Sequence, residues 1–288
     1  IVLRQNGIKQ RFYAVNTKQE MTHTNAELAQ LSIQKLLAEA LLPLQELELL
    51  ACATASPDQV LPSHASMVHG LLKNAPMEIF SASGICLSCI QAFKIAYLSI
   101  LAGNKRNAVC SCSELASAGL LSKNFDVEYE KCANLGIQPY MALEKDFLRF
   151  MLSDGASAVL LQDNPGKGKA LHIEWVEMTS YANELPTCMF MGAEKEKNGE
   201  LKSWKSFSSQ ELTDRSLFTV KQDIKLLERN AVPYWAKHIK YCLEKHNVAP
   251  ESISYVLPHV SSMFFYDKII NELKGIGIGI DESKWFTN

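Results

Sequence analysis

The chain has 288 residues, of which 47% are hydrophobic and 21% charged, so it can bury a sizeable core, and intrinsic disorder is excluded as its main state. Its 29 basic and 31 acidic side chains give a net charge of −2, which argues against nucleic acid as a partner. The most apolar stretch, residues 38–55, is interrupted by Glu39, Glu46 and Glu48, so we expect no membrane span.

Both ends of the chain look like the interior of a structural element. The first residues, Ile1 to Arg4, are typical of the middle of an element, and the last ones stop just after the apolar pair Trp285 and Phe286, with no closing helix or strand. We therefore expect the sequence to be a fragment of a longer protein. The eight cysteines follow no framework spacing, which predicts reduced thiols in a cytoplasmic protein.

The first part of the chain alternates short apolar runs with helical patterns. Thr24 and Asn25 can cap the first helix, whose leucines and isoleucines recur at helical spacing. The predicted helices are residues 24–42, 63–72 and 90–101, and the predicted strands are residues 47–54, 77–81, 108–112 and 155–161. Residues 122–150 look irregular, with one helical patch.

Residues 163–169 carry the strongest linker signal, a cluster of Pro, Gly, Asp, Asn and Lys. The same alternation then begins again, with strands at residues 171–178 and 253–257 and helices at 217–244, interrupted near Pro233, and at 263–274. Strands that alternate with helices predict an α/β protein with substantially parallel sheets. We expect two halves, residues 1–163 and 170–288.

Cys86 is the best candidate nucleophile. It follows a strand and the small residues Ser83 and Gly84, and it opens a helix, where unpaired N–H groups and the helix dipole stabilise a thiolate. A pKa of about 7 or below is expected for its thiol. The alternative interpretation is a small buried hydrophobic residue, as most free cysteines are.

Two other readings of the cysteines stay open. Cys86 and Cys89 form a Cys-x-x-Cys pair at the start of a helix, as in thiol-disulfide proteins, although Cys89 is also expected to point toward neighbouring packing. Cys110 and Cys112 are expected to face opposite sides of their strand, which argues against a metal site. The alternating glycines of residues 275–279 match no phosphate-binding motif, so no cofactor is expected.

His259 follows Pro258 at the end of a predicted strand, where α/β sheets place ligand sites. A hydrogen-bonded loop histidine is the alternative interpretation. Asp154 and Gly155 predict a tight turn into the next strand, since glycine has a conformational freedom that other residues lack.

Taken in order, these segments resemble the β-ketoacyl-acyl-carrier-protein synthase III family of the thiolase-like superfamily. The similar segments run over nearly the whole chain: Asn6 to Arg11, Leu61 to Ala65, Gly84 to Cys86 with Ala92, Ala96 and Gly103, Ser153 to Ala158, Leu257 to His259, and Phe286 to Asn288. Within the family, the sequences of residues 65–70, 144–149 and 192–195 are most similar to those of the dialkylresorcinol-type condensing enzymes.

The resemblance implies a layered αβαβα fold of two pseudo-symmetric halves that meet at a central helix pair. It also implies a decarboxylative Claisen condensation with acyl carrier protein or coenzyme A thioesters, and neither a cofactor nor a metal. Cys86 would carry the acyl group, and His259 would act as a neutral hydrogen-bond donor to an oxygen. The family's catalytic asparagine would lie beyond Asn288.

Two departures from the family pattern bear on activity and partners. The turn reads Cys86-Leu87-Ser88, with Ser88 in place of the usual glycine, and His259 is followed by Val260 rather than glutamine. The first departure keeps open a non-catalytic partner subunit of the same fold.

The resemblance further implies a homodimer in which edge strands of the two subunits pair. The matching strand is Asn107 to Cys112, which carries no charge. An uncharged edge strand favours pairing with another chain, whereas a central position in one sheet would explain the same composition.

Overall fold

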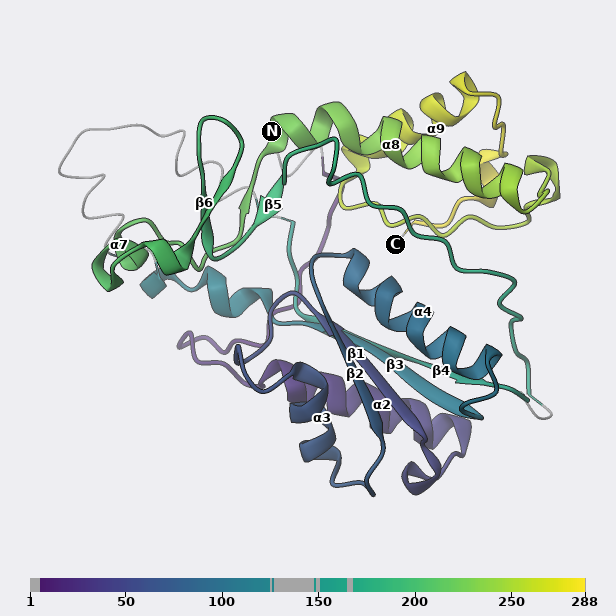
Figure 1. Ribbon diagram of the computed structural model, residues 1–288, viewed down its shortest axis with the longest axis horizontal. Helices are drawn as coiled ribbons and strands as arrows, with labels where there is room; N and C mark the ends of the chain where they lie inside the picture. Colours follow the sequence, from purple (N-terminus) through teal and green to yellow (C-terminus); the bar gives the residue numbers. More distant parts are fainter. Residues whose placement is uncertain (1–5, 125, 127–147, 149–150, 165–167, 288) are drawn as a thin grey trace. The chain divides into compact units, whose positions relative to one another are not determined.

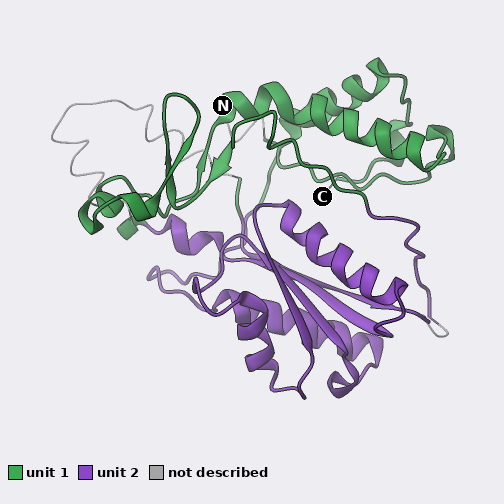
Figure 2. Ribbon diagram, viewed as in Figure 1, with its two compact units in different colours: residues 1–10, 122–152, 177–288 green, residues 11–121, 153–176 purple. Residues whose placement is uncertain are grey.

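The computed structural model describes residues 6–124, 126, 148, 151–164 and 168–287. The chain divides into two compact units, which are described separately (Figure 2). Unit 1 comprises residues 1–10, 122–152 and 177–288, and unit 2 comprises residues 11–121 and 153–176. These compact units do not coincide with the expected halves, 1–163 and 170–288, which remain a prediction about duplicated topology. Much of the expected irregular segment 122–150 lies outside the described residues.

Unit 2 is built on a four-stranded sheet with the order β2-β1-β3-β4 (Figure 1). The strands are β1 (Leu49–Thr54), β2 (Glu78–Ser83), β3 (Asn107–Glu114) and β4 (Gly155–Gln162). β1 pairs in parallel with both β2 and β3, whereas β4 is antiparallel to β3. The predicted strands of this part are confirmed, and three of the four run in parallel.

Helices cover both faces of this sheet. α2 (Asn25–Ala40) and α3 (His64–Leu72) pack on one face, and α4 (Leu87–Leu101) packs on the other (Figure 1). Alternate strand residues separate the two cores: Leu50 and Cys52 face α2 and α3, and Ala51 and Ala53 face α4. The side-chain period of two in a strand explains this division.

The start of α2 is specified locally. The Thr24 hydroxyl accepts a hydrogen bond from the Glu27 backbone N–H, and the Glu27 carboxylate accepts one from the Thr24 N–H, which completes a capping box. The Asp58 carboxylate accepts from the N–H groups of Asn25 and Ala26. These contacts satisfy donors that a helix leaves unpaired at its N-terminus.

α4 lies on the sheet through small side chains. Ala92 and Ala96 are completely buried. The other side of α4 exposes Leu87, Ile90 and Leu98. In a central helix pair, such an exposed apolar stripe would pack against the second helix. The helix pair itself remains a prediction.

The expectation that residues 107–112 form an edge strand is wrong. β3 is paired on both sides, with β1 and with β4, and most of its residues are buried. Its lack of charge therefore follows from its central position, because strands of parallel sheets that are covered on both faces read as apolar throughout. In the described sheet the edge strands are β2 and β4.

Among the described residues of unit 1, the two longer helices are α8 (Ile224–Lys245) and α9 (Tyr266–Gly275). They share an apolar core that includes Ala236, Ile270 and Trp285. α9 confirms the helix predicted from residue 263. α8 is shorter than predicted at its start, and it continues through Pro233.

The other elements described in unit 1 are short. β5 (Met189–Phe190) pairs with β8 (Lys221–Gln222), β6 (Ala193–Lys195) pairs with β7 (Leu201–Ser203), and α7 (Ser209–Asp214) precedes β8. Single 3₁₀ turns occur in both units, at Leu44–Glu46, Ala116–Leu120, Ser122–Asn124, Trp204–Ser206, Pro250–Ser252, Met263–Phe265 and Glu282–Lys284.

Two strands predicted for the second half are absent. Residues 171–178 form no strand; instead, the Tyr97 hydroxyl donates to the Glu174 carbonyl at 3.3 Å and Ile173 packs against the core under α4. Residues 253–257 form only one parallel bridge, Val256 with Trp285. Alternation of polar and apolar residues is insufficient for a strand without a neighbour to pair with. Within the described ranges, the helices are all too short or too polar to cross a membrane.

Candidate functional site

Cys86 occupies the N-cap position of α4, directly after β2 and its turn. The residue is exposed and its thiol is free. The first N–H groups of a helix have no partner within the helix and point toward its N-terminus. Cys86 thus lies where an oxygen that gains negative charge can be stabilised.

The turn before Cys86 requires glycine. Gly84 has a φ of +156°, which a residue with a side chain rarely adopts, and a Cβ there would lie 3.8 Å from that of Ser88. Gly84 therefore allows the chain to leave β2 and enter α4 within three residues.

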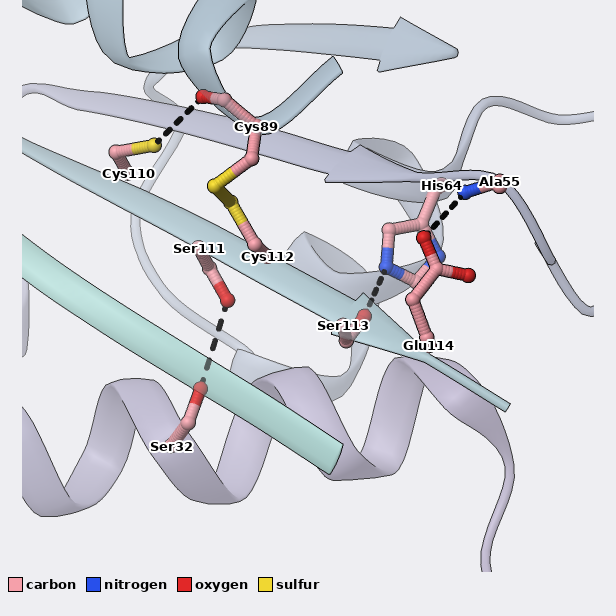
Figure 3. Close-up of a disulfide and its surroundings, with 9 residues drawn as sticks. All are labelled: Ser32, Ala55, His64, Cys89, Cys110, Ser111, Cys112, Ser113 and Glu114. Carbon is pink, nitrogen blue, oxygen red and sulfur yellow. Dashed lines mark hydrogen bonds between the residues drawn. A yellow bond between two sulfur atoms is a disulfide. The ribbon is translucent and has the colours of Figure 1, made fainter. Parts of the chain in front are cut away.

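Glu114 lies at the end of β3, at the same sheet edge as the turn to Cys86. The sequence analysis did not identify this polar residue. Its carboxylate accepts hydrogen bonds from the Ala55 N–H at 2.7 Å and the Ser56 hydroxyl at 2.6 Å (Figure 3 shows the contact with Ala55). The Ser56 hydroxyl in turn accepts from the Leu115 N–H at 2.9 Å. Glu114 thereby ties the chain after β1 to the end of β3.

The electrostatics of this edge oppose ionisation of the thiol. Desolvation raises the pKa of Glu114, although its hydrogen bonds from Ser56 and Ala55 oppose the rise. Cys86 is exposed as a residue, yet neighbouring protein atoms partly desolvate its thiol and raise its pKa, and the charge of Glu114 raises it further. The expected depressed pKa of Cys86 is therefore wrong, because desolvation and the charge of Glu114 outweigh the backbone hydrogen bond that lowers the pKa.

Cys89, in the first turn of α4, is joined to Cys112 of β3 by a disulfide, with 5.6 Å between their Cα atoms (Figure 3). The expectation of wholly reduced cysteines is thus wrong for this pair, and the Cys-x-x-Cys pairing of Cys86 with Cys89 is not formed. The expected opposite orientation of Cys110 and Cys112 is also wrong. Residues two apart share a strand face, and the Cys110 Sγ lies 3.9 Å from the Cys89 carbonyl oxygen.

The opposite face of β3 carries a separate polar contact. The buried His64 places its Nε2 3.0 Å from the Ser113 hydroxyl (Figure 3). Desolvation lowers the pKa of His64, which favours the neutral ring. Because Ser113 faces away from α4, we interpret this pair as structural.

Asp154 anchors the segment that resembles the family's Gly-Asp-Gly-Ala motif. Its carboxylate accepts from the N–H groups of Ala14 and Ser117, at 2.7 and 2.8 Å, and from the Ser117 hydroxyl. Its own N–H donates to the Phe12 carbonyl. Asp154 therefore holds three segments together at the start of β4 and has a structural role in unit 2.

His259 lies in unit 1, in an exposed loop after the single bridge at Val256. Val256 forms its bridge with Trp285. Its N–H donates to the Lys284 carbonyl, and its carbonyl accepts from the Phe286 N–H. Because the bridge is parallel, the chain after Phe286 starts in the same direction as the chain that leads to His259. Cys86 and His259 belong to different units, and their pairing is a proposal.

Comparison with known proteins points to one family. No family model matches the chain. The β-ketoacyl-acyl-carrier-protein synthase III of Aliarcobacter butzleri is 24% identical over 90% of this chain and 67% of its own length. The enzyme of the same name from Aquifex aeolicus is 27% identical over 100% of this chain and 74% of its own length.

Solved structures agree on the fold. A tetronic acid condensing enzyme is similar with a TM-score of 0.64 and 22% identity, over 93% of this chain and 71% of that one. A variant of Xanthomonas campestris OleA gives a TM-score of 0.66 at 18% identity, over 98% of this chain and 70% of that one. The fold is thiolase-like α/β, as expected. In sequence and in fold, the chain is thus similar to β-ketoacyl-acyl-carrier-protein synthase III condensing enzymes.

Within the described ranges, no group of three or more His, Cys, Asp or Glu side chains is arranged to hold a metal ion. The strand ends of unit 2 present one free thiol, Cys86, and the half-buried carboxylate of Glu114.

Because Glu114 raises the pKa of Cys86, we expect the rate of iodoacetamide alkylation of Cys86 to keep increasing above pH ~8.5, the usual cysteine value. Glu114→Gln removes the charge, so the pH profile should shift to lower pH. Glu78→Gln, on an exposed glutamate at the opposite end of β2, is the matched control and should leave the profile unchanged. An unchanged profile in Glu114→Gln would contradict this account of the thiol.

Proposed function

We propose that the protein catalyses a decarboxylative Claisen condensation through an acyl group carried by Cys86. The observation that carries this proposal is the exposed, free thiol at the N-cap of α4, next to the ends of the parallel strands. The similarity to β-ketoacyl-acyl-carrier-protein synthase III and to other condensing enzymes supports Claisen-type chemistry in lipid or polyketide synthesis. The acyl donor and the extender are proposed as thioesters of coenzyme A or acyl carrier protein.

In the first half-reaction, the thiolate of Cys86 attacks the carbonyl carbon of an acyl thioester. The carbonyl oxygen becomes negatively charged, and N–H groups at the start of α4 are the proposed donors to it. The bond to the donor's sulfur then breaks, and the donor leaves as a thiol. One difficult transfer is thereby divided into two easier ones.

In the second half-reaction, a malonyl thioester loses CO₂ and leaves an enolate on the extender. The enolate carbon attacks the acyl group, and the bond to the Cys86 sulfur breaks to regenerate the thiolate. His259 is the proposed neutral donor to the enolate oxygen. The parallel bridge at Val256 supports this, because it starts the segment after Phe286, where the family has its asparagine loop, alongside the segment of His259.

The finer assignment is a condensing enzyme of the dialkylresorcinol type, with a malonyl- or β-ketoacyl-carrier-protein extender. It rests on the sequences of residues 65–70, 144–149 and 192–195. Of these, residues 144–147 lie outside the described residues. The bonds formed and broken at Cys86 are the same for either extender in the acyl transfer step.

A non-catalytic subunit of the same fold is the second candidate function. The raised pKa of Cys86 favours it, because a smaller fraction of the thiol is ionised at neutral pH. The exposed position of Cys86 favours the enzyme. The two candidates differ in whether an acyl adduct forms on Cys86.

We expect incubation with an acyl thioester to add one acyl mass to the protein, mapped to Cys86 by peptide mass spectrometry. Cys86→Ala should abolish this adduct because it removes the nucleophile. Cys89→Ala, the matched control in the next helical turn, should keep loading within a few-fold. Loading on Cys89, or no adduct at all, would exclude Cys86 as the acyl carrier, and the latter result would favour the non-catalytic subunit.

For His259→Ala we expect acyl loading to persist and malonyl decarboxylation to fall by about 10²–10³-fold, the usual effect of losing one oxyanion donor. His259→Asn, which retains a hydrogen-bond donor, should recover part of the rate. Release of labelled CO₂ measures the second step separately from loading. Equal loss of both steps would instead assign His259 to binding or stability.

We also propose that the protein is a homodimer. β3 is central in its sheet and cannot form the edge-strand contact between subunits. We therefore propose that the contact is formed by an edge strand, β2 or β4. β4 carries no charged residue, and β2 carries only Glu78. Long uncharged edges are the kind that pair with a second chain, and a two-fold axis allows identical strands to pair antiparallel.

Sedimentation velocity at micromolar concentration should give the mass of a dimer of the full-length protein. Its concentration dependence should yield a single monomer–dimer equilibrium, as expected for a closed two-fold interface. A monomer across the micromolar range would refute the homodimer, and a series of larger species would refute its closed symmetry.

A further inference from the structure

The first turn of α4 carries a Cys-x-x-Cys motif that the proposed acyl transfer does not explain. Cys86 and Cys89 are three residues apart, so their side chains are neighbours on the same side of the helix start. Disulfides join cysteines with Cα atoms about 4.4–6.8 Å apart, a range that includes residues one helical turn apart. An accessible thiol in this position can therefore react with Cys86.

Cys89 is not available for that reaction in the structure. It is bonded across to Cys112, on the face of β3 that points toward α4 (Figure 3). Both residues of the bond are half-buried, so small oxidants and reductants can reach it. Cys110 has the same orientation, but its thiol is buried and its pKa is raised to about 12, so it stays protonated.

With Cys89 held in this bond, Cys86 is the one exposed free thiol among the described residues of unit 2. We propose that the Cys89–Cys112 pair is a redox modification site that keeps Cys86 out of disulfides by giving Cys89 a different partner. Its importance for catalysis rests on the proposed role of Cys86, whereas the disulfide exchange itself does not.

The bond forms when the two thiols lose two protons and two electrons to a two-electron oxidant. With a low-molecular-weight disulfide, RSSR, the thiols of Cys89 and Cys112 yield one protein disulfide and two RSH. If Cys112 is absent, the same oxidant joins Cys89 to its other neighbour, Cys86, and again releases two RSH. The second reaction consumes the free thiol of the helix N-cap.

The test oxidises the reduced full-length protein with diamide, which takes up the two protons and two electrons and becomes a hydrazine. After removal of diamide, N-ethylmaleimide labels the free thiols, and peptide mass spectrometry maps labels and disulfides. In the wild type we expect a Cys89–Cys112 bond and complete labelling of Cys86. In Cys112→Ser we expect a Cys86–Cys89 bond and at least a tenfold loss of Cys86 labelling, reversed by dithiothreitol.

Two variants control for the loss of a cysteine as such. Cys110→Ala removes a thiol from the same strand face and should behave as the wild type. Cys89→Ser with Cys112→Ser removes both partners and should keep Cys86 labelled after diamide. Circular dichroism of each variant shows that it is folded, so a change in labelling is not caused by unfolding.

Full labelling of Cys86 in oxidised Cys112→Ser would overturn the proposal, and so would a Cys86–Cys89 bond in the oxidised wild type or a Cys89–Cys110 bond in the variant. These readouts need no acyl substrate. A protein that fails to load an acyl group but shows the expected disulfides would refute the proposed function and leave this inference standing. A protein that loads an acyl group on Cys86 but does not form these disulfides would refute this inference and leave the proposed function standing.

Discussion

The parallel pairing of β1 with both β2 and β3 is the constraint on which the candidate site depends. Its register places Thr54 opposite Ser83 and Ala53 opposite Cys112, so the carboxyl ends of three strands meet at one edge. The turn to Cys86 and the carboxylate of Glu114 both follow from this alignment. A slip of one residue would turn Cys112 to the other face of the sheet, away from Cys89.

Small side chains let α4 approach that sheet. Alanines make up most of the buried residues between them, with Ala92 and Ala96 on the helix, and Leu49, Cys110 and Leu161 complete the buried set. Such a layer brings the helix backbone close to the strands. The Cys89–Cys112 bond joins helix and strand at the first turn of α4, which adds a covalent constraint at the end of the helix that carries Cys86.

The sequence was sufficient to predict the local elements of unit 2. The capping residues of α2, the small residues at the start of α4 and the burial of Ala92 all depend on neighbours in the chain. It was insufficient for the place of β3 in the sheet, because an uncharged strand fits both an edge and a centre. The choice depends on β4, which arrives more than 40 residues later in the chain.

The same limit applies to the candidate site. Cys86 was found because its turn and helix are local, whereas the partner of Cys89 depends on the register between α4 and β3. Glu114 was missed because its hydrogen bonds go to Ala55 and Ser56, which lie far from it in the sequence. In unit 1, polar and apolar residues alternate over residues 253–257 as they do in a strand. The segment nevertheless forms only a single bridge, between Val256 and Trp285.

The raised pKa of Cys86 has two opposite effects on acyl transfer. It lowers the fraction of thiolate at neutral pH, which slows the first attack. It also makes each thiolate a stronger nucleophile, because nucleophilicity increases with the pKa of the thiol, and a poorer leaving group. An acyl group on Cys86 would therefore resist transfer to weak acceptors such as water and await a stronger carbon nucleophile. In the proposed mechanism, desolvation and Glu114 would thus favour a long-lived acyl thioester over rapid turnover of the free thiol.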